Sequence, residues 1–216
     1  MSLSDEAAEM AMPMVIKVGG SWLASPGGVA ALCGWLGSPA ARCATKRLLI
    51  VGGGPMVEGL RQIDRANPFS AQASHWAAID AMDTNTRLLA SRLPDWRYTE
   101  SFETVRQNMA GDWLMATGYF LRTAEPAAPG ERLEASWDVT SDSIAARIAA
   151  LLPGRLVLLK AVSPPAGCRS LKDLSALGYV DPSIDRILPR GTPVRCLGVA
   201  EAGLAPDPAG NQSECS

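Results

Sequence analysis

The chain alternates short apolar runs with longer stretches whose apolar residues recur at helical spacing. Three of the runs, Met14–Val18, Arg47–Val51 and Leu156–Val162, have the length of strands and contain few polar residues. The longest helical stretch, His75–Arg92, places its apolar residues roughly along one face. This alternation predicts an α/β fold in which helices cover a mainly parallel sheet.

The same pattern predicts several shorter elements and irregular ends. Pro55 suits the first turn of a helix, because its missing N–H has no intrahelical partner there. We expect residues 1–13 to be flexible, residues 205–216 to be disordered and Arg122–Arg132 to form an exposed loop. The other expected elements are the helices Gly28–Leu36, Pro55–Ala66, Ile144–Leu152, Leu171–Leu177 and Ser183–Leu188 and the strands Trp96–Thr99, Trp113–Thr117 and Val194–Leu197.

Composition argues against several classes of function. The 216 residues, 47% of them hydrophobic, suffice for a substantial core in one domain or two fused lobes. A formal net charge of −2 without a long basic run argues against nucleic acid as a partner. No apolar run reaches the length of a membrane span, and the first residues lack a signal-peptide pattern. The five cysteines contain no CxxC pair, so we expect reduced thiols, no zinc site and a soluble cytoplasmic protein.

Two glycine turns carry the clearest chemical signal. Gly19-Gly20 follows the first strand directly, and Gly52-Gly53-Gly54 follows the second. Because glycine lacks a Cβ, the backbone N–H groups of such turns can approach a ligand closely, and they suit phosphate oxygens. Lys17 lies two residues before the first turn, where its ammonium group can reach the same anion. Together these features predict a phosphoryl-transfer site.

Two better-known phosphate motifs are absent from the sequence. It contains no GxxxxGK[ST], and Val57 stands where the third glycine of a GxGxxG fingerprint would fall. The plainer alternative is that the glycines only form tight turns from strand to helix. Lys17, together with Ser141-Asp142 at the start of a later helix, favours a phosphate site over that alternative.

The ordered set of motifs resembles the amino acid kinase family, which includes acetylglutamate, glutamate, aspartate and uridylate kinases. The motifs are Lys17-Val18-Gly19-Gly20-Ser21, Gly52-Gly53-Gly54 and Thr140-Ser141-Asp142, and the match covers about residues 14–162. The resemblance implies a three-layer αβα sandwich that transfers the γ-phosphoryl group of ATP, with Mg²⁺, to a carboxylate, carbamate or phosphate. It also implies one kinase-like domain over residues 14–204, with an acceptor lobe at about 14–135 and a shortened nucleotide lobe at about 136–204.

The resemblance assigns roles to individual residues. Lys17 would neutralise charge on the transferring group, and Asp142 would orient Lys17 or help to place Mg²⁺. Ser141 and Lys160 would lie on the nucleotide side. The plainer alternatives are that Asp142 caps a helix and that Lys160 extends to water. The expected phosphate-binding residues are Gly19, Gly20, Ser21, Gly52, Gly53 and Gly54.

Two further segments make the resemblance closer to one branch of the family. They are Ser74-His75 at the start of a long helix and Ser136-Trp137 before the third motif. Both resemble the branch of methanofuran synthesis that phosphorylates [5-(aminomethyl)furan-3-yl]methyl phosphate to its diphosphate. In that branch His75 would contact the acceptor phosphate from a helix N-terminus, although a cap or a packed ring is the plainer alternative. Trp137 would stack on the furan ring or pack in the core, and Asp83 would pair with the acceptor's ammonium group.

The second half of the chain departs from the family pattern. Ser163-Pro164-Pro165 follows the third apolar run where the family usually has Asp-Gly, and the family's second lysine motif is missing. This leaves open a non-catalytic binding or regulatory protein with the same fold, or a kinase of another small acid or nucleoside monophosphate. For the kinase we expect a homodimer that uses a small phosphorylated substrate and binds neither nucleic acid nor membranes. We assign Arg61 and the other helix arginines to solvated faces.

Overall fold

The computed structural model describes residues 12–198, except residues 109 and 169. Most of the N-terminal segment 1–13 and all of the tail 205–216, for which we expect flexibility and disorder, lie outside the described residues. Within the described ranges, no helix combines the length and the apolar character that crossing a membrane requires.

One parallel sheet forms the centre of the described structure. Its strands are β1 (Met14–Val18), β2 (Lys46–Val51), β3 (Arg97–Thr99), β4 (Gly111–Met115), β5 (Arg155–Lys160) and β6 (Val194–Gly198). They lie in the order β3-β4-β2-β1-β5-β6, and every neighbouring pair is parallel. Because β2 and β5 flank β1, the segments that follow these three strands meet at the carboxyl edge of the sheet, where open α/β sheets bind ligands.

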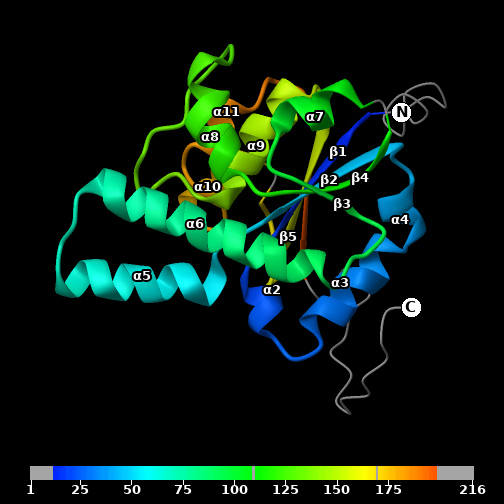
Figure 1. Ribbon diagram of the computed structural model, residues 1–216. Coiled ribbons are helices and arrows are strands. Elements are labelled where there is room, and N and C mark those ends of the chain that lie inside the picture. Colours follow the sequence, from blue (N-terminus) through cyan, green and yellow to red (C-terminus); the bar gives the residue numbers. More distant parts are fainter. Residues whose placement is uncertain (1–11, 109, 169, 199–216) are drawn as a thin grey trace.

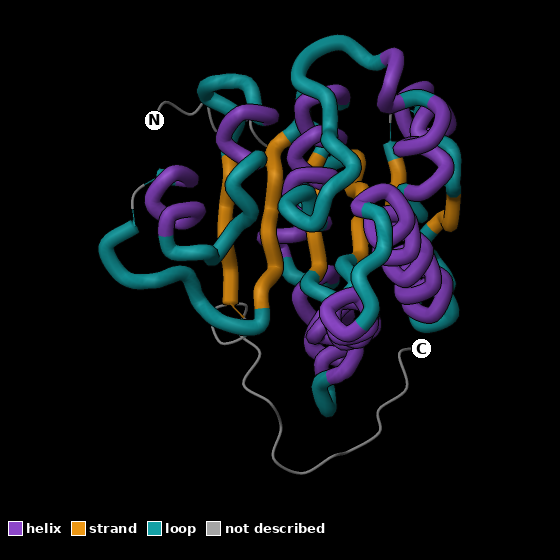
Figure 2. The backbone as a smooth tube through the Cα atoms, turned by 90° about the vertical axis from the view of Figure 1, so that its left-hand side faces the viewer, coloured by secondary structure: helices purple, strands orange, loops and turns teal. Residues whose placement is uncertain are grey.

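Helices cover both faces of the sheet and complete three layers (Figures 1 and 2). The α/β fold expected from the sequence is thereby confirmed. The α-helices are α2 (Ser21–Ala24), α3 (Gly28–Leu36), α4 (Pro39–Arg42), α5 (Gly54–Ala66), α6 (Ala71–Ala90), α7 (Phe102–Gln107), α8 (Gly118–Thr123), α9 (Ser141–Leu151), α10 (Leu171–Ala176) and α11 (Ile184–Ile187), and a 3-10 turn, η1, spans Glu125–Ala127.

Two apolar cores lie on the two faces of the sheet. Along β1, Ile16 packs into the core with α2 to α4, and Val15 packs into the core with α8 to α11. Successive side chains of a strand point to opposite faces, so both members of each pair are buried. The strands of a sheet that is covered on both sides therefore have continuous apolar sequences, which is the pattern found here.

Helices α5 and α6 form a hairpin that extends beyond the sheet (Figure 1). No residue of α5 is buried, whereas α6 contributes Ile79 and Met82 to one core and Leu89 to the other. Helix α6 thus packs into both cores, and α5 lies alongside it. The space between the two helices becomes important for the site described below.

Some predicted bounds are wrong, and hydrogen bonds explain two of the differences. Helix α6 begins at Ala71, four residues before the predicted start, because Ser70 caps it by accepting from the N–H of Ala73. Helix α9 begins at Ser141 because Thr140 accepts from the N–H of Asp142. The strand predicted at Trp113–Thr117 instead spans Gly111–Met115.

The prediction of an exposed loop at Arg122–Arg132 is wrong in part, because α8 ends inside this range, η1 lies within it and one of its side chains is buried. Glu125 is buried, and its carboxylate pairs with Arg147 of α9 at 3.1 Å. Arg147 also donates to the carbonyl oxygens of Ala128 and Pro129. One buried guanidinium group therefore fastens this loop to α9.

We predict that Glu125→Ala lowers the free energy of unfolding by about 3–5 kcal/mol, because it leaves the buried charge of Arg147 without a partner. Urea unfolding followed by circular dichroism measures this change. Glu103→Ala is the matched control, since it removes an exposed carboxylate paired with Arg106 and is expected to cost less than about 1 kcal/mol. Equal losses for the two variants would contradict a structural role for the buried pair.

Candidate active site

The two glycine turns lie against each other at the carboxyl edge of the sheet. A Cβ on Gly20 would collide with the carbonyl oxygen of Gly52 and the backbone nitrogen of Gly54. Gly54 also has a φ of +53°, a conformation that favours glycine, and a Cβ there would collide with Gly20 in turn. The glycines therefore allow a backbone-to-backbone contact that side chains would prevent.

Not every N–H group of the two turns is available to a ligand. Gly19 donates to the carbonyl oxygen of Leu159 at 2.9 Å, and Gly52 donates to that of Val18 at 2.8 Å. These bonds continue the sheet, so the expectation that the Gly19 amide holds phosphate is wrong, and Gly52, also expected to bind phosphate, has its N–H group engaged.

The other N–H groups of the turns remain free for a ligand. Within the described part of the chain, no acceptor is present for the N–H groups of Gly20, Ser21, Gly53 and Gly54, each at the start of α2 or α5. Free amides at adjoining helix starts form an anion site, so the structure brings together the residues expected to bind phosphate.

Asn85 of α6 fixes the second turn. Its side-chain amide donates to the carbonyl oxygens of Gly52 and Gly53, both at 2.9 Å, and the residue is buried. Because Asn85 binds both carbonyl oxygens on one side of the turn, the N–H groups of Gly53 and Gly54 point to the opposite side. Asn85 is thus a positioning residue that the sequence did not reveal.

A buried carboxylate between two ammonium groups forms the charged part of the site. Asp142 Oδ1 lies 2.9 Å from Nζ of Lys17 at the carboxyl half of β1, and Oδ2 lies 2.5 Å from Nζ of Lys160 at the end of β5. Asp142 is only 3% exposed and Lys17 only 6%. The alternative readings of Asp142 as a helix cap and of Lys160 as a lysine extending to water are wrong, because Thr140 is the cap and Lys160 is paired.

Burial and neighbouring charges together lower the pKa values of Asp142 and Lys160. Burial alone would raise the pKa of Asp142, but the ammonium groups of Lys17 and Lys160 outweigh it and hold that pKa below its ordinary value. Burial, together with repulsion from Lys17, lowers the pKa of Lys160, and Asp142 opposes this. The three groups carry two positive charges and one negative charge, which leaves one positive charge for an anion.

A second carboxylate fixes the start of α9. Asp181 accepts from the N–H and Oγ1 of Thr140, at 3.1 and 2.9 Å, and from the N–H of Ser143 at 2.9 Å. Asp181 also accepts from the hydroxyl of Ser143. Because these bonds hold the first turn of α9, they also fix the backbone from which Asp142 reaches the two lysines.

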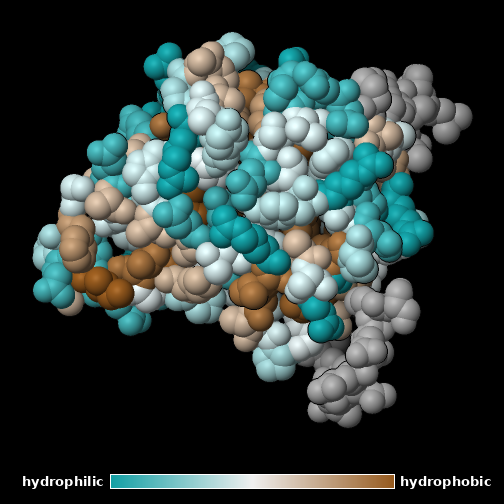
Figure 3. All heavy atoms as spheres, in the orientation of Figure 1, coloured by the Kyte–Doolittle hydropathy of each residue, from teal (hydrophilic) through white to brown (hydrophobic). Residues whose placement is uncertain are grey.

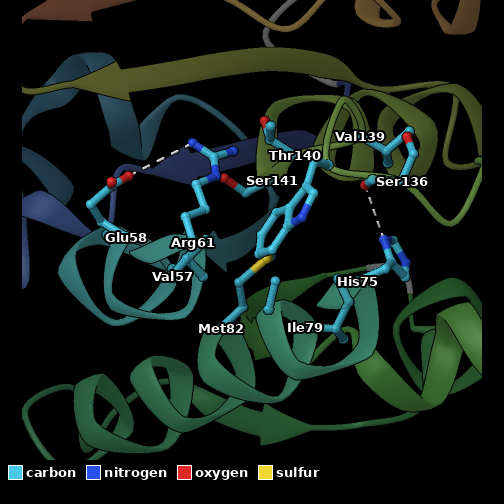
Figure 4. Close-up of a pocket in the computed structure, with 14 residues that line it drawn as sticks. Val57, Glu58, Arg61, His75, Ile79, Met82, Ser136, Val139, Thr140 and Ser141 are labelled. Carbon is cyan, nitrogen blue, oxygen red and sulfur yellow. Dashed lines mark hydrogen bonds and ion pairs between the residues drawn. The ribbon is translucent and has the colours of Figure 1, made fainter. Parts of the chain in front are cut away.

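A cavity of about 250 Å³ opens beside the second turn, between α5, α6 and the start of α9 (Figure 4). We call it the acceptor cavity. Gly53, Gly54 and Ser141 contribute to its wall, and the assignment of Ser141 to the nucleotide side stays a prediction. Its remaining lining residues are Val57, Glu58, Arg61, His75, Ala78, Ile79, Met82, Ser136, Trp137, Val139 and Thr140.

His75 lines the acceptor cavity but not from a helix N-terminus. It lies in the second turn of α6, and its Nδ1 is 3.3 Å from the carbonyl oxygen of Ser136 (Figure 4). A carbonyl can only accept, so Nδ1 carries the proton and the neutral ring keeps Nε2 as an acceptor. Burial lowers the pKa of His75, and the charge of Arg122 lowers it further, against the opposing hydrogen bond to Ser136.

Trp137 lines the cavity together with Arg61, which the sequence had assigned to a solvated face. The Arg61 guanidinium group lies 5.2 Å from the centre of the Trp137 ring, and the ring's Nε1 donates to Asp64 at 3.1 Å. Gly54, Glu58 and Arg61 recur at helical spacing on one face of α5, which is the signal that could have identified Arg61.

Asp83 does not face the acceptor cavity. Its buried carboxylate accepts from the N–H of Thr117 at 2.7 Å and from that of Gly118 at 3.1 Å. Asp83 thereby binds the start of α8 to α6, and burial raises its pKa. The expectation that Asp83 pairs with a substrate ammonium group is wrong.

The residues of the site suit phosphate better than a metal ion held by protein alone. Across residues 12–198, leaving out 109 and 169, no three His, Cys, Asp or Glu side chains are grouped to hold a metal ion. Each oxygen of Asp142 is already within ion-pair distance of a lysine. Free amides and ammonium groups fit the oxygens of a nucleotide phosphate, so Mg²⁺ would be held chiefly by the nucleotide.

Comparisons with known proteins agree with this geometry. The family described as "Amino acid kinase family" matches residues 12–164. The fold is similar to that of uridylate kinase from Archaeoglobus fulgidus, with a TM-score of 0.53 and 19% identity over 75% of this chain and 70% of that chain. Aspartate kinase from Synechocystis aligns with a TM-score of 0.47 and 12% identity over 71% of this chain and 29% of that chain. No curated protein matches the sequence.

We predict that acidification below about pH 6.5 destabilises the protein partly through His75. Because the folded state lowers the pKa of His75, the unfolded chain takes up the proton first as the pH falls. His75→Gln removes this contribution, and His75 is the only histidine of the chain. Urea unfolding at about pH 7.5 and about pH 5.5 should show a smaller loss of unfolding free energy for the variant than for the wild type. Identical losses would contradict a lowered pKa.

Proposed function

The chain belongs to the amino acid kinase family, and from that premise we propose that it transfers the γ-phosphoryl group of ATP to a small acceptor that already carries a phosphate. The observation that carries the proposal is Asp142 between the ammonium groups of Lys17 and Lys160, at the edge of the sheet where the two glycine turns meet. Such a site combines fixed positive charge with free amide donors, which is what phosphoryl transfer requires of a protein.

In the proposed reaction, an oxygen of the acceptor phosphate attacks the γ-phosphorus of ATP. The new P–O bond forms as the bond to the β,γ-bridging oxygen breaks, and ADP leaves with that electron pair. Lys17 and Lys160 neutralise the charge that spreads over the transferring group, and the N–H groups of Gly20, Ser21, Gly53 and Gly54 hold its oxygens in line. Mg²⁺ bound to the nucleotide phosphates would neutralise further charge.

A phosphate acceptor fits the groups around the acceptor cavity. A phosphate monoester has an ionised oxygen at neutral pH, so the attack needs no general base, and Asp142 is engaged by two lysines. Arg61 supplies a guanidinium group at the cavity wall and can pair with the phosphate of the acceptor. His75 can donate to the same phosphate from Nε2 once it is protonated, which binding of an anion favours.

Within this class we propose [5-(aminomethyl)furan-3-yl]methyl phosphate as the first acceptor to test. The Trp137 ring is a surface on which a furan can stack, and it lines the cavity. Glu58 replaces Asp83 as the candidate partner of the ammonium group, because it lines the same wall; its carboxylate pairs with Arg65 at 3.0 Å and would exchange that exposed partner for the substrate. A nucleoside monophosphate is the competing acceptor, because the similar structure from Archaeoglobus fulgidus is a uridylate kinase.

Lys160 also argues against the alternative of a binding protein without catalysis. That alternative rested on the shortened second half of the chain and on the missing second lysine motif, and Lys160 answers only the second point. Lys160 supplies a second ammonium group on Asp142, and the carbonyl oxygen of Tyr179 holds it at 2.7 Å. This arrangement supports the catalytic proposal. A division into acceptor and nucleotide lobes, a homodimer and a cytoplasmic location remain predictions.

We predict that the purified protein with Mg-ATP converts aminomethylfuran phosphate to its diphosphate and releases ADP in equal amount. Coupled ADP detection and phosphorus NMR of the product measure this, with uridine monophosphate and acetylglutamate as competing acceptors. Turnover with acetylglutamate alone would contradict a phosphate acceptor, and no ADP release with any acceptor would contradict the kinase proposal.

We predict that Lys17→Ala lowers kcat by roughly a hundredfold to a thousandfold, because a fixed electrostatic donor contributes about 3–4 kcal/mol to the transition state. Lys172→Ala is the matched control, since it removes an exposed lysine of α10 outside the site. Circular dichroism establishes that both variants fold. A kcat of Lys17→Ala close to that of the control would contradict the assigned role.

A further inference from the structure

A separate cavity of about 230 Å³ lies on the face of the sheet that α3 and α4 cover. Arg155 lines it at the first position of β5, and we call it the Arg155 cavity. Lys160 stands at the last position of the same strand and belongs to the active site. An extended strand of this length spans roughly 17 Å, so the Arg155 cavity is distinct from the active site.

Arg155 is a half-buried cation without a carboxylate partner. Its Nη2 donates to Sγ of Cys43 at 2.7 Å, and its Nε is buried and has no hydrogen-bond partner within the described part of the chain. The Cys43 thiol donates in turn to the carbonyl oxygen of Ala40 at 3.0 Å, so it keeps its proton and supplies no negative charge. A charge that leaves water without a counter-ion is costly, which favours binding of an anion here.

The fully buried arginines among the described residues do have carboxylate partners. Arg47 pairs with Asp112, and Arg147 pairs with Glu125. The fold thus compensates the guanidinium groups that it buries most deeply. Because Arg155 lacks such compensation and lines a cavity, its unpaired Nε points to a ligand.

Arg195 of β6 brings a second guanidinium group to the same cavity. It lies opposite Val157 in the register of β5 and β6. Since Val157 is two residues after Arg155 and side chains alternate along a strand, Arg155 and Arg195 project from the same face of the sheet. Arg195 is exposed, and no carboxylate in the described ranges lies within ion-pair distance of it. The cavity therefore offers two uncompensated positive charges.

The rest of the cavity wall is mainly apolar. Met14, Trp35, Val157 and Leu197 line it and belong to one core. On the face seen in Figure 3, hydrophilic side chains gather over α4, which borders the cavity through Ala40, whereas hydrophobic ones gather over the α5–α6 hairpin. The Arg155 cavity thus combines an apolar floor with cationic groups, which suits a ligand that has an apolar body and an anionic end.

We propose that the Arg155 cavity binds a small organic carboxylate, with its carboxylate group between Arg155 and Arg195 and an apolar ring against Trp35. A planar guanidinium group forms paired hydrogen bonds with a carboxylate. A single negative charge suits the site better than a phosphate dianion, because apolar surroundings make each further charge costly. The cavity is smaller than the usual 300–1,000 Å³ of pockets for drug-sized ligands, so roughly one ring fits. The inference goes beyond the proposed function and does not depend on it.

A ligand-observed NMR titration without nucleotide tests the proposal, with benzoate, acetate and benzyl alcohol as probes. We expect benzoate to bind more tightly than acetate, because its ring leaves water on binding. Benzoate should also bind more tightly than benzyl alcohol, which has the same ring without the charge. Saturating ADP should leave the affinity for benzoate unchanged, because the Arg155 cavity lies outside the active site.

Arg155→Met removes the charge but keeps a long side chain, and it should weaken benzoate binding by about tenfold or more. Arg195→Met should weaken it by up to about fivefold, because Arg195 is exposed. Arg190→Met is the matched control, since it removes an exposed arginine close to β6 that does not line the cavity, and it should leave binding unchanged. The urea midpoint of Arg155→Met should lie close to that of the wild type, because the variant breaks no ion pair.

Four outcomes would overturn the inference. The first is benzoate binding no tighter than that of benzyl alcohol, and the second is an unchanged affinity for benzoate in Arg155→Met. The third is displacement of benzoate by ADP, which would place benzoate in the active site. The fourth is a large fall in the urea midpoint of Arg155→Met, which would show that the fold compensates this charge. Because no measurement uses turnover, an inactive protein would contradict the kinase proposal alone.

Discussion

The site depends on one buried carboxylate that holds two like charges together. Lys17 and Lys160 come from adjacent strands, and their ammonium groups repel each other in a poorly hydrated place. Asp142 makes their proximity tolerable, because each of its oxygens pairs with one of them. A buried charge without a partner is costly, so the three side chains constrain one another and keep a net positive charge at the edge of the sheet.

The parallel sheet and the helix α6 supply the rest of the arrangement. Neighbouring parallel strands end at the same edge, which brings Lys17, Lys160 and both glycine turns together. Helix α6 is buried in both cores and holds the second turn through Asn85 and the start of α8 through Asp83. The amides that remain free are costly to leave unpaired, and a bound phosphate would satisfy them.

Sequence reasoning succeeded where the signal is local and failed where it depends on distant contacts. Strands buried on both faces, and turns that need glycine, leave patterns within a few residues, so β1, β2 and the contact of the two turns could be predicted. The use of the Gly19 N–H by Leu159 could not be predicted, because it requires knowing that β5 lies beside β1. Asp83 was misassigned for the same reason, since its partner Thr117 is 34 residues away.

The central claim is that Lys17, Lys160 and the free amides of the glycine turns converge on one transferring phosphoryl group. A crystal structure with ADP, Mg²⁺ and aluminium fluoride tests it most directly, because the fluoride imitates that group in the transition state. The account predicts fluorine atoms within about 3 Å of both lysine Nζ atoms and of the Gly20 and Gly53 nitrogens. A fluoride bound away from the two turns, with both lysines still paired with Asp142 and neither contacting the fluoride, would contradict it.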